Sequence, residues 1–307
     1  MSDLRHSAET YLALRRGLGF KLRQHGPMLA DFVAYLERAG ASTVTTKHAL
    51  AWAIQPQDVQ PYRWGQRLCV VRGFARYLAA FDPAAEVPPQ DLLSQSHHRP
   101  VPFIYTEAEI AVLLNATDEL RPALRAATHR CLFGLLAATG MRISEAIALN
   151  RDDVDQDAGV LVIRQTKFNK SRQLPLHRSV VDELRRYAAR RDEFCPRPRV
   201  PSFFVSTAGS RLIDTCVRHV FVRLVAHVGL LPRFGSGRPR VHDLRHHFAV
   251  ACLLDWYRAG EDVAARVPLL SAYLGHAGLA STYWYLQATP ELLALAAQRL
   301  GRNGELR

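Results

Sequence analysis

Apolar positions recur at helical spacing through the first third of the chain. Residues 28–36 carry apolar side chains three and four positions apart, and Gly40 follows as a helix stop. Similar stripes cover three further stretches, residues 11–20, 47–54 and 62–81. This periodicity predicts an all-helical unit over residues 1–95.

The pattern changes at residues 96–103, where Pro, Ser and His predict an extended linker. The chain beyond it, residues 104–307, mixes helical stripes with short extended runs. Two of these runs, 160–163 and 173–176, flank a polar, turn-forming stretch and predict a β-hairpin. A third run, 203–205, predicts one more strand of a small sheet.

Helices are expected on both sides of this hairpin. Thr106 and Glu109 have the spacing of a capping box, which opens a helix, and further stripes predict helices over 124–138 and 215–230. An amphipathic stretch at 289–300 predicts a C-terminal helix. The expected fold class is therefore mainly α with a small β-sheet, in which a helical N-terminal domain precedes a mixed α/β domain.

The charge balance indicates a polyanionic partner. The 307 residues contain 40 Lys and Arg against 28 Asp and Glu, a net charge of +12, and arginine far outnumbers lysine. Arginine binds phosphate through a rigid fork of donors, so nucleic acid is the expected partner. A GC-rich genome that favours arginine codons would give the same bias, and charge alone leaves this alternative open.

Other classes of protein lack support in the sequence. The five cysteines are widely spaced and form no CxxC pair, so neither a disulfide framework nor a zinc site is expected. The adjacent His97 and His98 lie in the predicted linker. They could be metal ligands or simply polar linker residues, and we predict no metal site. No apolar run approaches the roughly 20 residues of a membrane span, and no signal peptide is evident. We expect a soluble, cytoplasmic protein with no membrane partner.

Candidate chemistry concentrates in residues 241–286, where His242 and Arg245 precede His276 and Tyr285. A tyrosine hydroxyl titrates near roughly 10, so it is a useful nucleophile only if cations neutralise the charge that develops on its target. Arg142 supplies such a cation upstream, because it follows a glycine at a predicted helix start.

Four stretches together resemble the tyrosine recombinase (phage integrase) family. They are ATGMRISEAIAL at 138–149, TKFNKSRQLPL at 166–176, VHDLRHHFA at 241–249 and LGHAGLASTYWY at 274–285. The resemblance implies a core-binding domain over 1–95 and a catalytic domain over 104–307 that acts on double-stranded DNA recombination sites. It also implies chemistry without metal or other cofactor.

The resemblance assigns a role to each matching residue. Arg142 and Arg245 would bind the non-bridging oxygens of the scissile phosphate, with His242 and His276 hydrogen-bonding it or assisting proton transfer. Tyr285 would be the nucleophile that forms a 3′-phosphotyrosine intermediate. The supporting roles would fall to Lys167, as general acid toward the leaving 5′-hydroxyl, and to Glu145, as the acidic residue behind the site.

Several assignments have alternatives. Tyr283 lies two positions before Tyr285, and Lys170 three after Lys167, so each is a second candidate for its neighbour's role. His246 is interpreted as a packing or supporting residue, as is His247. Glu145 and Arg142 would also be compatible with an ordinary surface ion pair.

Basic residues outside the site are candidates for DNA contacts. They lie on the helix at 62–81, on the hairpin and in a Gly/Pro-rich loop: Arg63, Arg67, Lys170, Arg172, Arg238 and Arg240. For the helical arginines a solvated surface is the alternative.

The expected function is site-specific recombination or integration, and the arginine-rich start at 14–20 weakly favours service to a mobile element. The alternatives are a chromosome- or plasmid-resolving recombinase, a type IB-like topoisomerase and an inactive DNA-binding accessory protein. The helix at 289–300 would dock on its own domain or on a neighbour in a DNA-bound homotetramer.

Overall fold

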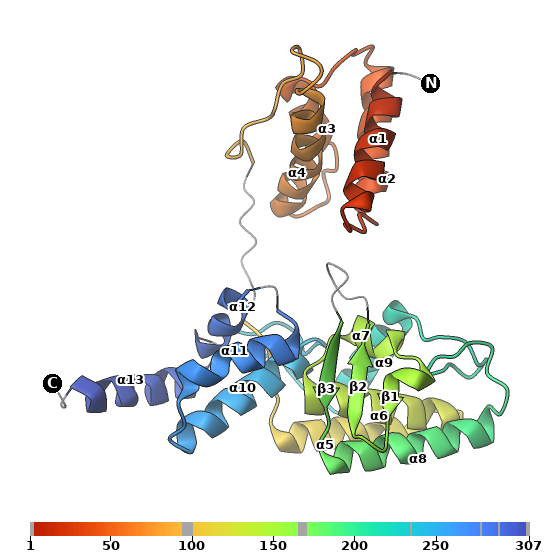
Figure 1. The fold of residues 1–307 in the computed structure, drawn as a ribbon, viewed down its shortest axis with the longest axis vertical. Helices are drawn as coiled ribbons and strands as arrows, with labels where there is room; N and C mark the ends of the chain where they lie inside the picture. The colour runs from red at the N-terminus through yellow and green to blue at the C-terminus, as the bar shows by residue number, and fades with distance from the viewer. Residues whose placement is uncertain are drawn as a thin grey trace. The chain divides into compact units, whose positions relative to one another are not determined.

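The computed structural model describes residues 3–93, 101–164, 171–233, 235–276, 278–287 and 289–304. The chain divides into two compact units, Met1–Arg99 and Pro100–Arg307, each with its own core (Figure 1). Phe103, placed in the linker by the sequence, is 2% exposed in the core of the second unit. The ordered second unit therefore begins within the predicted linker.

The first unit is helical in its described part. Its helices are α1 (Asp3–Gly17), α2 (His25–Arg38), α3 (Thr46–Ala53) and α4 (Pro61–Leu78). Phe32, Trp52 and Phe74 are fully buried where α2, α3 and α4 meet. The apolar stripes of the sequence are the faces that pack here, as helical periodicity predicted.

The helices of the second unit surround a small sheet. They are α5 (Glu107–Ala116), α6 (Ala123–Thr139), α7 (Ile143–Ala148), α8 (Arg178–Phe194), α9 (Asp214–His227), α10 (Asp243–Arg258), α11 (Val263–Leu274), α12 (Ala280–Tyr283) and α13 (Pro290–Gly304). Short 3₁₀ turns occupy Thr117–Glu119, Arg151–Asp153 and Trp284–Gln287. The predicted capping box is formed by Thr106 and Glu109 at the start of α5.

The sheet is antiparallel, with strands β1 (Val154–Asp155), β2 (Val160–Ile163) and β3 (Arg172–Pro175) in that order. Leu161 pairs with Leu174, and both are completely buried on the face that packs against the helices. The predicted hairpin is confirmed, but the predicted third strand is wrong. Within residues 203–205 only Val205 forms an isolated bridge, to Arg211, and the third strand is the two-residue β1.

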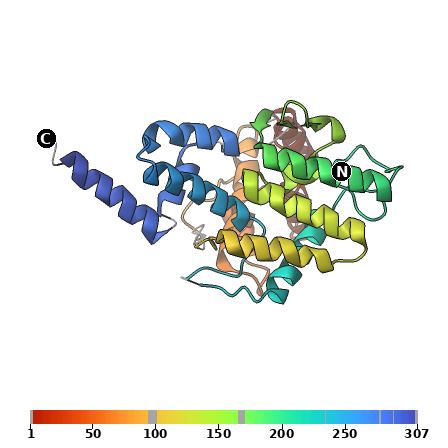
Figure 2. The ribbon, with the colours of Figure 1, turned by 90° about the horizontal axis from the view of Figure 1, so that it is seen from below.

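The second unit has two apolar clusters. One joins the sheet to α6, α8 and α9, and the other lies among α10, α11 and the start of α13. Leu292, near the start of α13, is fully buried, whereas Leu293 is 51% exposed. Beyond this point α13 extends away from the rest of the unit (Figures 1 and 2). None of the helices in the described ranges has the length and apolar character that a bilayer-spanning segment needs.

Candidate active site

Arg142 stands at the junction of two helices. Gly140 ends α6 with a φ of +60°, and a Cβ there would come within 2.6 Å of the Phe248 ring, so only glycine fits this turn. Arg142 then caps α7: its backbone N–H donates to Glu145 (3.0 Å) and its Nη1 donates to the same carboxylate (2.9 Å). The Nη2 group donates to Gly275 O at 3.0 Å. The Arg142 side chain remains 36% exposed and is therefore accessible to an anion.

Arg245 lies deeper, in the first turn of α10. Its Nη1 donates to Gly140 O (2.8 Å) and its Nη2 to Leu274 O (2.9 Å), and the residue is 3% exposed. Burial, followed by the charge of Arg142, lowers the pKa of Arg245 to about 10, while Tyr285 and Glu145 act in the opposite direction. Arg245 stays charged at neutral pH, and its closeness to Arg142 concentrates positive charge.

Glu145 is the carboxylate that balances part of this charge. Burial alone would raise its pKa, but hydrogen bonds from Arg172 and from the Arg142 backbone, together with both guanidinium charges, hold the pKa below its ordinary value. The side chain is 7% exposed. The predicted Glu145–Arg142 contact is present, and Glu145 faces the interior rather than solvent.

His242 begins α10, next to Arg245. Partial desolvation by the surrounding protein, together with the charges of Arg245 and Arg240, lowers the pKa of His242 to about 4. Its ring still reaches solvent. The imidazole is therefore neutral at neutral pH, so it can accept a proton or donate a hydrogen bond without adding charge.

Tyr285 and His276 meet in the second apolar cluster. The His276 ring stacks on the Tyr285 ring with centroids 6.1 Å apart, and His276 Nδ1 lies 2.7 Å from the hydroxyl of Thr282. Tyr285 is 1% exposed, whereas Tyr283 is 45% exposed. Tyr285 acts to raise the pKa of Arg245, against the larger, opposite effect of burial.

The structure therefore gathers one tyrosine hydroxyl, two histidines and two arginines from segments far apart in the sequence. Fixed guanidiniums beside a hydroxyl suit an anionic centre that gains negative charge as the hydroxyl attacks it. The sequence profile of the phage integrase family matches residues 104–291, which contain all of these groups.

The chain belongs to the phage integrase family. It is 44% identical to the putative integrase/recombinase y4rB of Sinorhizobium fredii over 99% of each chain. The fold of the integrase resembles XerH recombinase bound to its difH substrate, with a TM-score of 0.65 and 20% identity over 89% of this chain and 78% of that one. It also resembles the Tn1549 transposon integrase in complex with circular intermediate DNA, with a TM-score of 0.65 and 17% identity over 96% and 99%. The integrase is thus a tyrosine-type site-specific recombinase.

Two arginines that the sequence placed on DNA-contact surfaces of the integrase are turned inward. Arg172 donates two bonds to Glu145 (3.1 and 2.8 Å) and one to Tyr273 O (3.0 Å). Arg67 donates to Trp52 O (3.0 Å) and lies 3.7 Å from the centroid of that ring. Their side chains are only 15% and 17% exposed, so the prediction of surface contacts does not fit either one.

The remaining basic candidates differ in placement. Arg63 and Arg238 are exposed, and Arg240 is half-exposed while pairing with Asp243 at 2.9 Å. Lys167 and Lys170 lie outside the described residues of the integrase, so their roles stay predictions. The Nδ1 atom of His247 lies at hydrogen-bonding distance, 2.8 Å, from Tyr105 O, a contact that suits a packing or supporting residue.

Sequence reasoning missed two supporting residues, Asp243 and Thr282, and gave a third, the inward-facing Arg172, the role of a DNA contact. Asp243 is fully buried and binds Arg240, while Thr282 is fully buried beside His276. Only Arg172 had a usable signal, because alternation along a strand puts it on the same face as the buried Leu174. Neither Asp243 nor Thr282 belongs to a pattern that separates it from ordinary polar residues.

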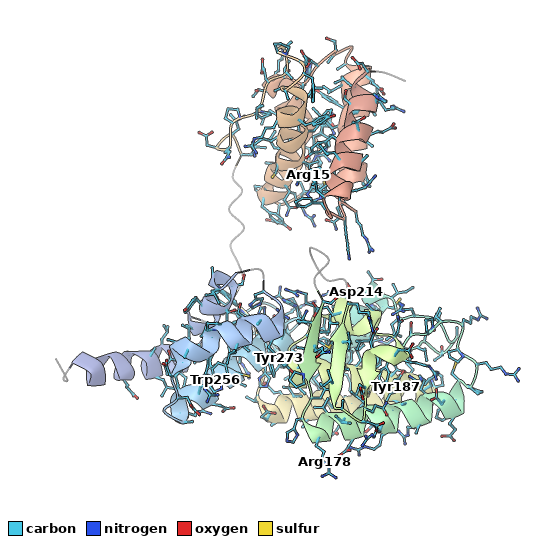
Figure 3. All side chains as sticks on the ribbon, in the orientation of Figure 1. Arg15, Arg178, Tyr187, Asp214, Trp256 and Tyr273 are labelled. Carbon is cyan, nitrogen blue, oxygen red and sulfur yellow. The ribbon has the colours of Figure 1, made fainter. Side chains whose placement is uncertain are left out.

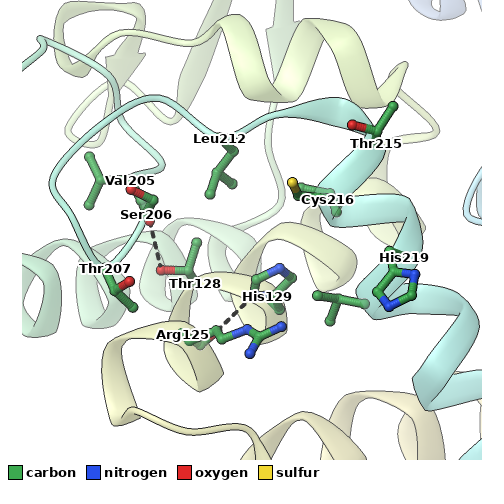
Figure 4. A pocket seen from close by; sticks show the side chains of 12 residues that line it. Arg125, Thr128, His129, Val205, Ser206, Thr207, Leu212, Thr215, Cys216 and His219 are labelled. Atoms are coloured by element: carbon green, nitrogen blue, oxygen red, sulfur yellow. Dashed lines mark hydrogen bonds between the residues drawn. The ribbon is translucent and has the colours of Figure 1, made fainter.

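A pocket of about 380 Å³ lies elsewhere in the second unit, between α6, α9 and the loop at 205–212 (Figure 4). His129, whose Nδ1 lies 2.8 Å from Arg125 O, and Thr128 form one wall. Its lining includes none of the described candidate catalytic residues. Within the described ranges there is also no group of three or more His, Cys, Asp or Glu side chains arranged to hold a metal ion.

Proposed function

We propose that the integrase cleaves and rejoins DNA strands at specific recombination sites through Tyr285, in the service of a mobile genetic element. One observation carries the assignment of the nucleophile: the Tyr285 ring stacks on the ring of His276, and the carbonyl of the preceding residue, Gly275, accepts a hydrogen bond from Arg142. Tyr283, in contrast, is 45% exposed. The kinship to a putative integrase/recombinase and the fold likeness to a transposon integrase support the mobile-element role.

In the proposed reaction, Tyr285 Oη forms a bond to phosphorus as the bond from phosphorus to the 5′ oxygen breaks. Arg142 and Arg245 bind the non-bridging oxygens, whose negative charge grows in the transition state. The phenolic proton passes to a histidine of the site, His242 or His276, and Lys167 gives a proton to the leaving 5′ oxygen, which departs as a hydroxyl. The product is a 3′-phosphotyrosine, and attack by a 5′-hydroxyl of the partner strand reverses each transfer.

The burial of Tyr285 sets a condition on this reaction. At 1% exposure its hydroxyl cannot reach a duplex, so the segment Trp284–Gln287 has to shift when DNA binds. The same shift would bring the hydroxyl to a phosphate held by Arg142, the more accessible of the two arginines.

We further propose that residues 1–95 form the core-binding domain and residues 104–307 the catalytic domain, with both contacting double-stranded DNA. Arg63, Arg238 and Arg240 are the candidate phosphate contacts, because their side chains reach solvent. The Tn1549 integrase and XerH, which the chain resembles in fold, are each described in complex with DNA.

The C-terminal helix supplies the proposed contact between protomers in a DNA-bound homotetramer. Leu292, near the start of α13, is buried against its own unit, whereas the neighbouring Leu293 is 51% exposed. Docking of this helix on a neighbour would bury that apolar surface, which water otherwise contacts.

A covalent-capture experiment with randomised DNA tests the nucleophile and finds the recombination site at the same time. Nicked duplexes of random sequence are incubated with the protein, and DNA that becomes covalently attached is selected and sequenced. We expect the wild-type protein to enrich a defined site, Tyr285→Phe to give no adduct, and Tyr283→Phe to retain it. Adduct formation by Tyr285→Phe would refute the assignment.

A further inference from the structure

The C-terminal end of α11 is bound by arginines from three different segments. Each of three consecutive carbonyls accepts one hydrogen bond, and the pairs are Arg172 Nε with Tyr273 O (3.0 Å), Arg245 Nη2 with Leu274 O (2.9 Å) and Arg142 Nη2 with Gly275 O (3.0 Å). Carbonyls at a helix C-terminus lack partners within the helix and carry partial negative charge, so guanidiniums bind there favourably. His276 is the next residue, and its backbone position is therefore set by this triple contact.

Arg172 differs from the other two arginines in its partners. It reaches Glu145 with two nitrogens, at 3.1 and 2.8 Å, and uses its third on Tyr273 O. The side chain is 15% exposed against 36% for Arg142. All three guanidinium nitrogens of Arg172 donate to the protein, whereas the side-chain hydrogen bonds described for Arg142 and Arg245 use only the two Nη groups of each. The phosphate-binding role is therefore left to Arg142 and Arg245.

The shared carboxylate makes the position of Arg142 depend on Arg172. Glu145 Oε1 accepts from Arg142 Nη1 and from Arg172 Nη1, so one carboxylate oxygen fixes both guanidiniums. Bidentate pairing holds the carboxylate plane in one orientation. Without Arg172, Glu145 would be free to rotate toward Arg142 and withdraw that guanidinium from a phosphate.

The backbone is shaped around the Arg172 guanidinium. Gly275 has a φ of +68°, and a Cβ at this position would lie 2.6 Å from Arg172 Nη1. A second tie joins the same elements, because the Tyr273 hydroxyl donates to Pro175 O at 3.5 Å and Tyr273 lies where α11 approaches the strands (Figure 3). Strand β3 is thus attached to the α11 terminus through two side chains.

We propose that Arg172 is a positioning residue for strand cleavage. It fixes the position of Glu145, and through Glu145 that of Arg142, relative to the C-terminal end of α11, which precedes His276. Arg172 does not itself bind DNA. This inference rests on the proposed cleavage reaction. It assigns to the first residue of β3 a function separate from the one predicted for Lys167.

The test compares Arg172→Gln with a matched control, Arg191→Gln. Arg191 has the same set of partners in another part of the unit: two nitrogens on the Asp192 carboxylate, at 2.9 and 3.0 Å, and one on Phe203 O, at 2.9 Å. Both substitutions remove a bidentate ion pair and a carbonyl contact, so both are expected to lower the melting temperature. Only Arg172→Gln should alter chemistry.

The measured quantities are the single-turnover rate of covalent cleavage at saturating DNA and the Kd for the same duplex, one selected by the wild-type protein. We expect Arg172→Gln to lower the rate about 10- to 100-fold, because a displacement near 1 Å of a catalytic group costs about that much. The Kd and its dependence on salt should stay within about twofold of wild type, since no phosphate contact is lost. Arg191→Gln should keep the wild-type rate.

Two results would overturn the proposal. A wild-type cleavage rate in Arg172→Gln would show that Arg172 does not position Arg142 for cleavage. A higher Kd for the duplex that also depends less on salt concentration would identify Arg172 as a DNA contact. If Arg172→Gln does not fold, Arg172→Lys is measured instead, because it keeps the charge but cannot span both carboxylate oxygens. Failure of the proposed function is recognised separately, by adduct formation in Tyr285→Phe.

Discussion

Both units of the integrase bury arginines, but they use them differently. In the first unit, Arg72 is 3% exposed and donates to Pro88 O (2.7 Å) and Pro89 O (2.6 Å), which ties the segment after α4 back to that helix. Arg67 likewise ends on a backbone carbonyl and an aromatic face. Each of these guanidiniums acts alone, as a structural tie.

In the second unit three guanidiniums converge on one helix terminus and share a single carboxylate. Arg142, Arg172 and Arg245 carry three positive charges, and Glu145 pairs with two of them. The excess charge persists in a largely desolvated place, where like charges repel strongly. We infer that a site for an anionic substrate is distinguished by several guanidiniums that meet at one place. Neither the burial of single arginines nor the number of charges is sufficient.

The contrast is tested most strongly at Arg245. We expect Arg245→Gln to lower the rate of covalent cleavage by at least about 100-fold, because a donor aimed at the developing charge is lost. The measurement is single-turnover adduct formation, corrected for the folded fraction from thermal melting. A loss below tenfold would mean that this buried arginine, like Arg72, is only a structural tie.

The reciprocal substitution, Arg72→Gln, should affect stability without affecting chemistry. Removing hydrogen bonds from a buried charged group to two carbonyls is expected to cost about 1–3 kcal/mol of unfolding free energy. Hydrogen–deuterium exchange in α4 peptides should become faster, while the cleavage rate of the DNA-bound protein stays unchanged. A cleavage defect comparable to that of Arg245→Gln would remove the distinction between the units.

The smallest expected effect concerns His242 and pH. Its pKa of about 4 in the folded protein lies below the unfolded value near 6.5, so the unfolded state binds more protons between these limits. His242 therefore makes stability rise with pH across that window. Its contribution is fully present above about pH 6.5 and lost as the pH falls toward 4.

His242→Gln should weaken this pH dependence. The melting temperature measured at pH 5 and at pH 7.5 should differ less in the variant than in the wild type. An NMR titration of the imidazole should show no transition near neutral pH. A midpoint near 6.5 would mean that neither burial nor the charges of Arg245 and Arg240 lower the pKa of the ring.

Much of the fold follows from local patterns in the sequence. The helical stripes, the capping box at Thr106 and the hairpin all rest on contacts within a few residues. Strand β1 escaped prediction because two residues cannot show an alternating pattern, and the apolar run at 203–205 took its place. Edge pairing of so short a strand is decided by tertiary contacts.

The candidate site was predictable to the extent that its residues belong to recognisable motifs. Arg142, His242, Arg245, His276 and Tyr285 were named from sequence, and the structure brings them together. The direction of a long side chain was not predictable for Arg67, because an arginine stem can lie along apolar surface or extend into water with the same sequence pattern. Arg172 was placed in the turn before the predicted strand 173–176, so alternation was not applied to it, whereas β3 begins at Arg172.

The proposed mechanism depends most directly on which tyrosine becomes attached to DNA. The covalent adduct can be digested with trypsin and nuclease, and residues 267–299 form one tryptic peptide that contains both Tyr283 and Tyr285. Fragmentation of that peptide in the mass spectrometer shows which residue carries the nucleotide that remains attached through its 3′ phosphate. We predict that it is carried by Tyr285, whereas attachment to Tyr283 or to another residue would contradict the proposed mechanism.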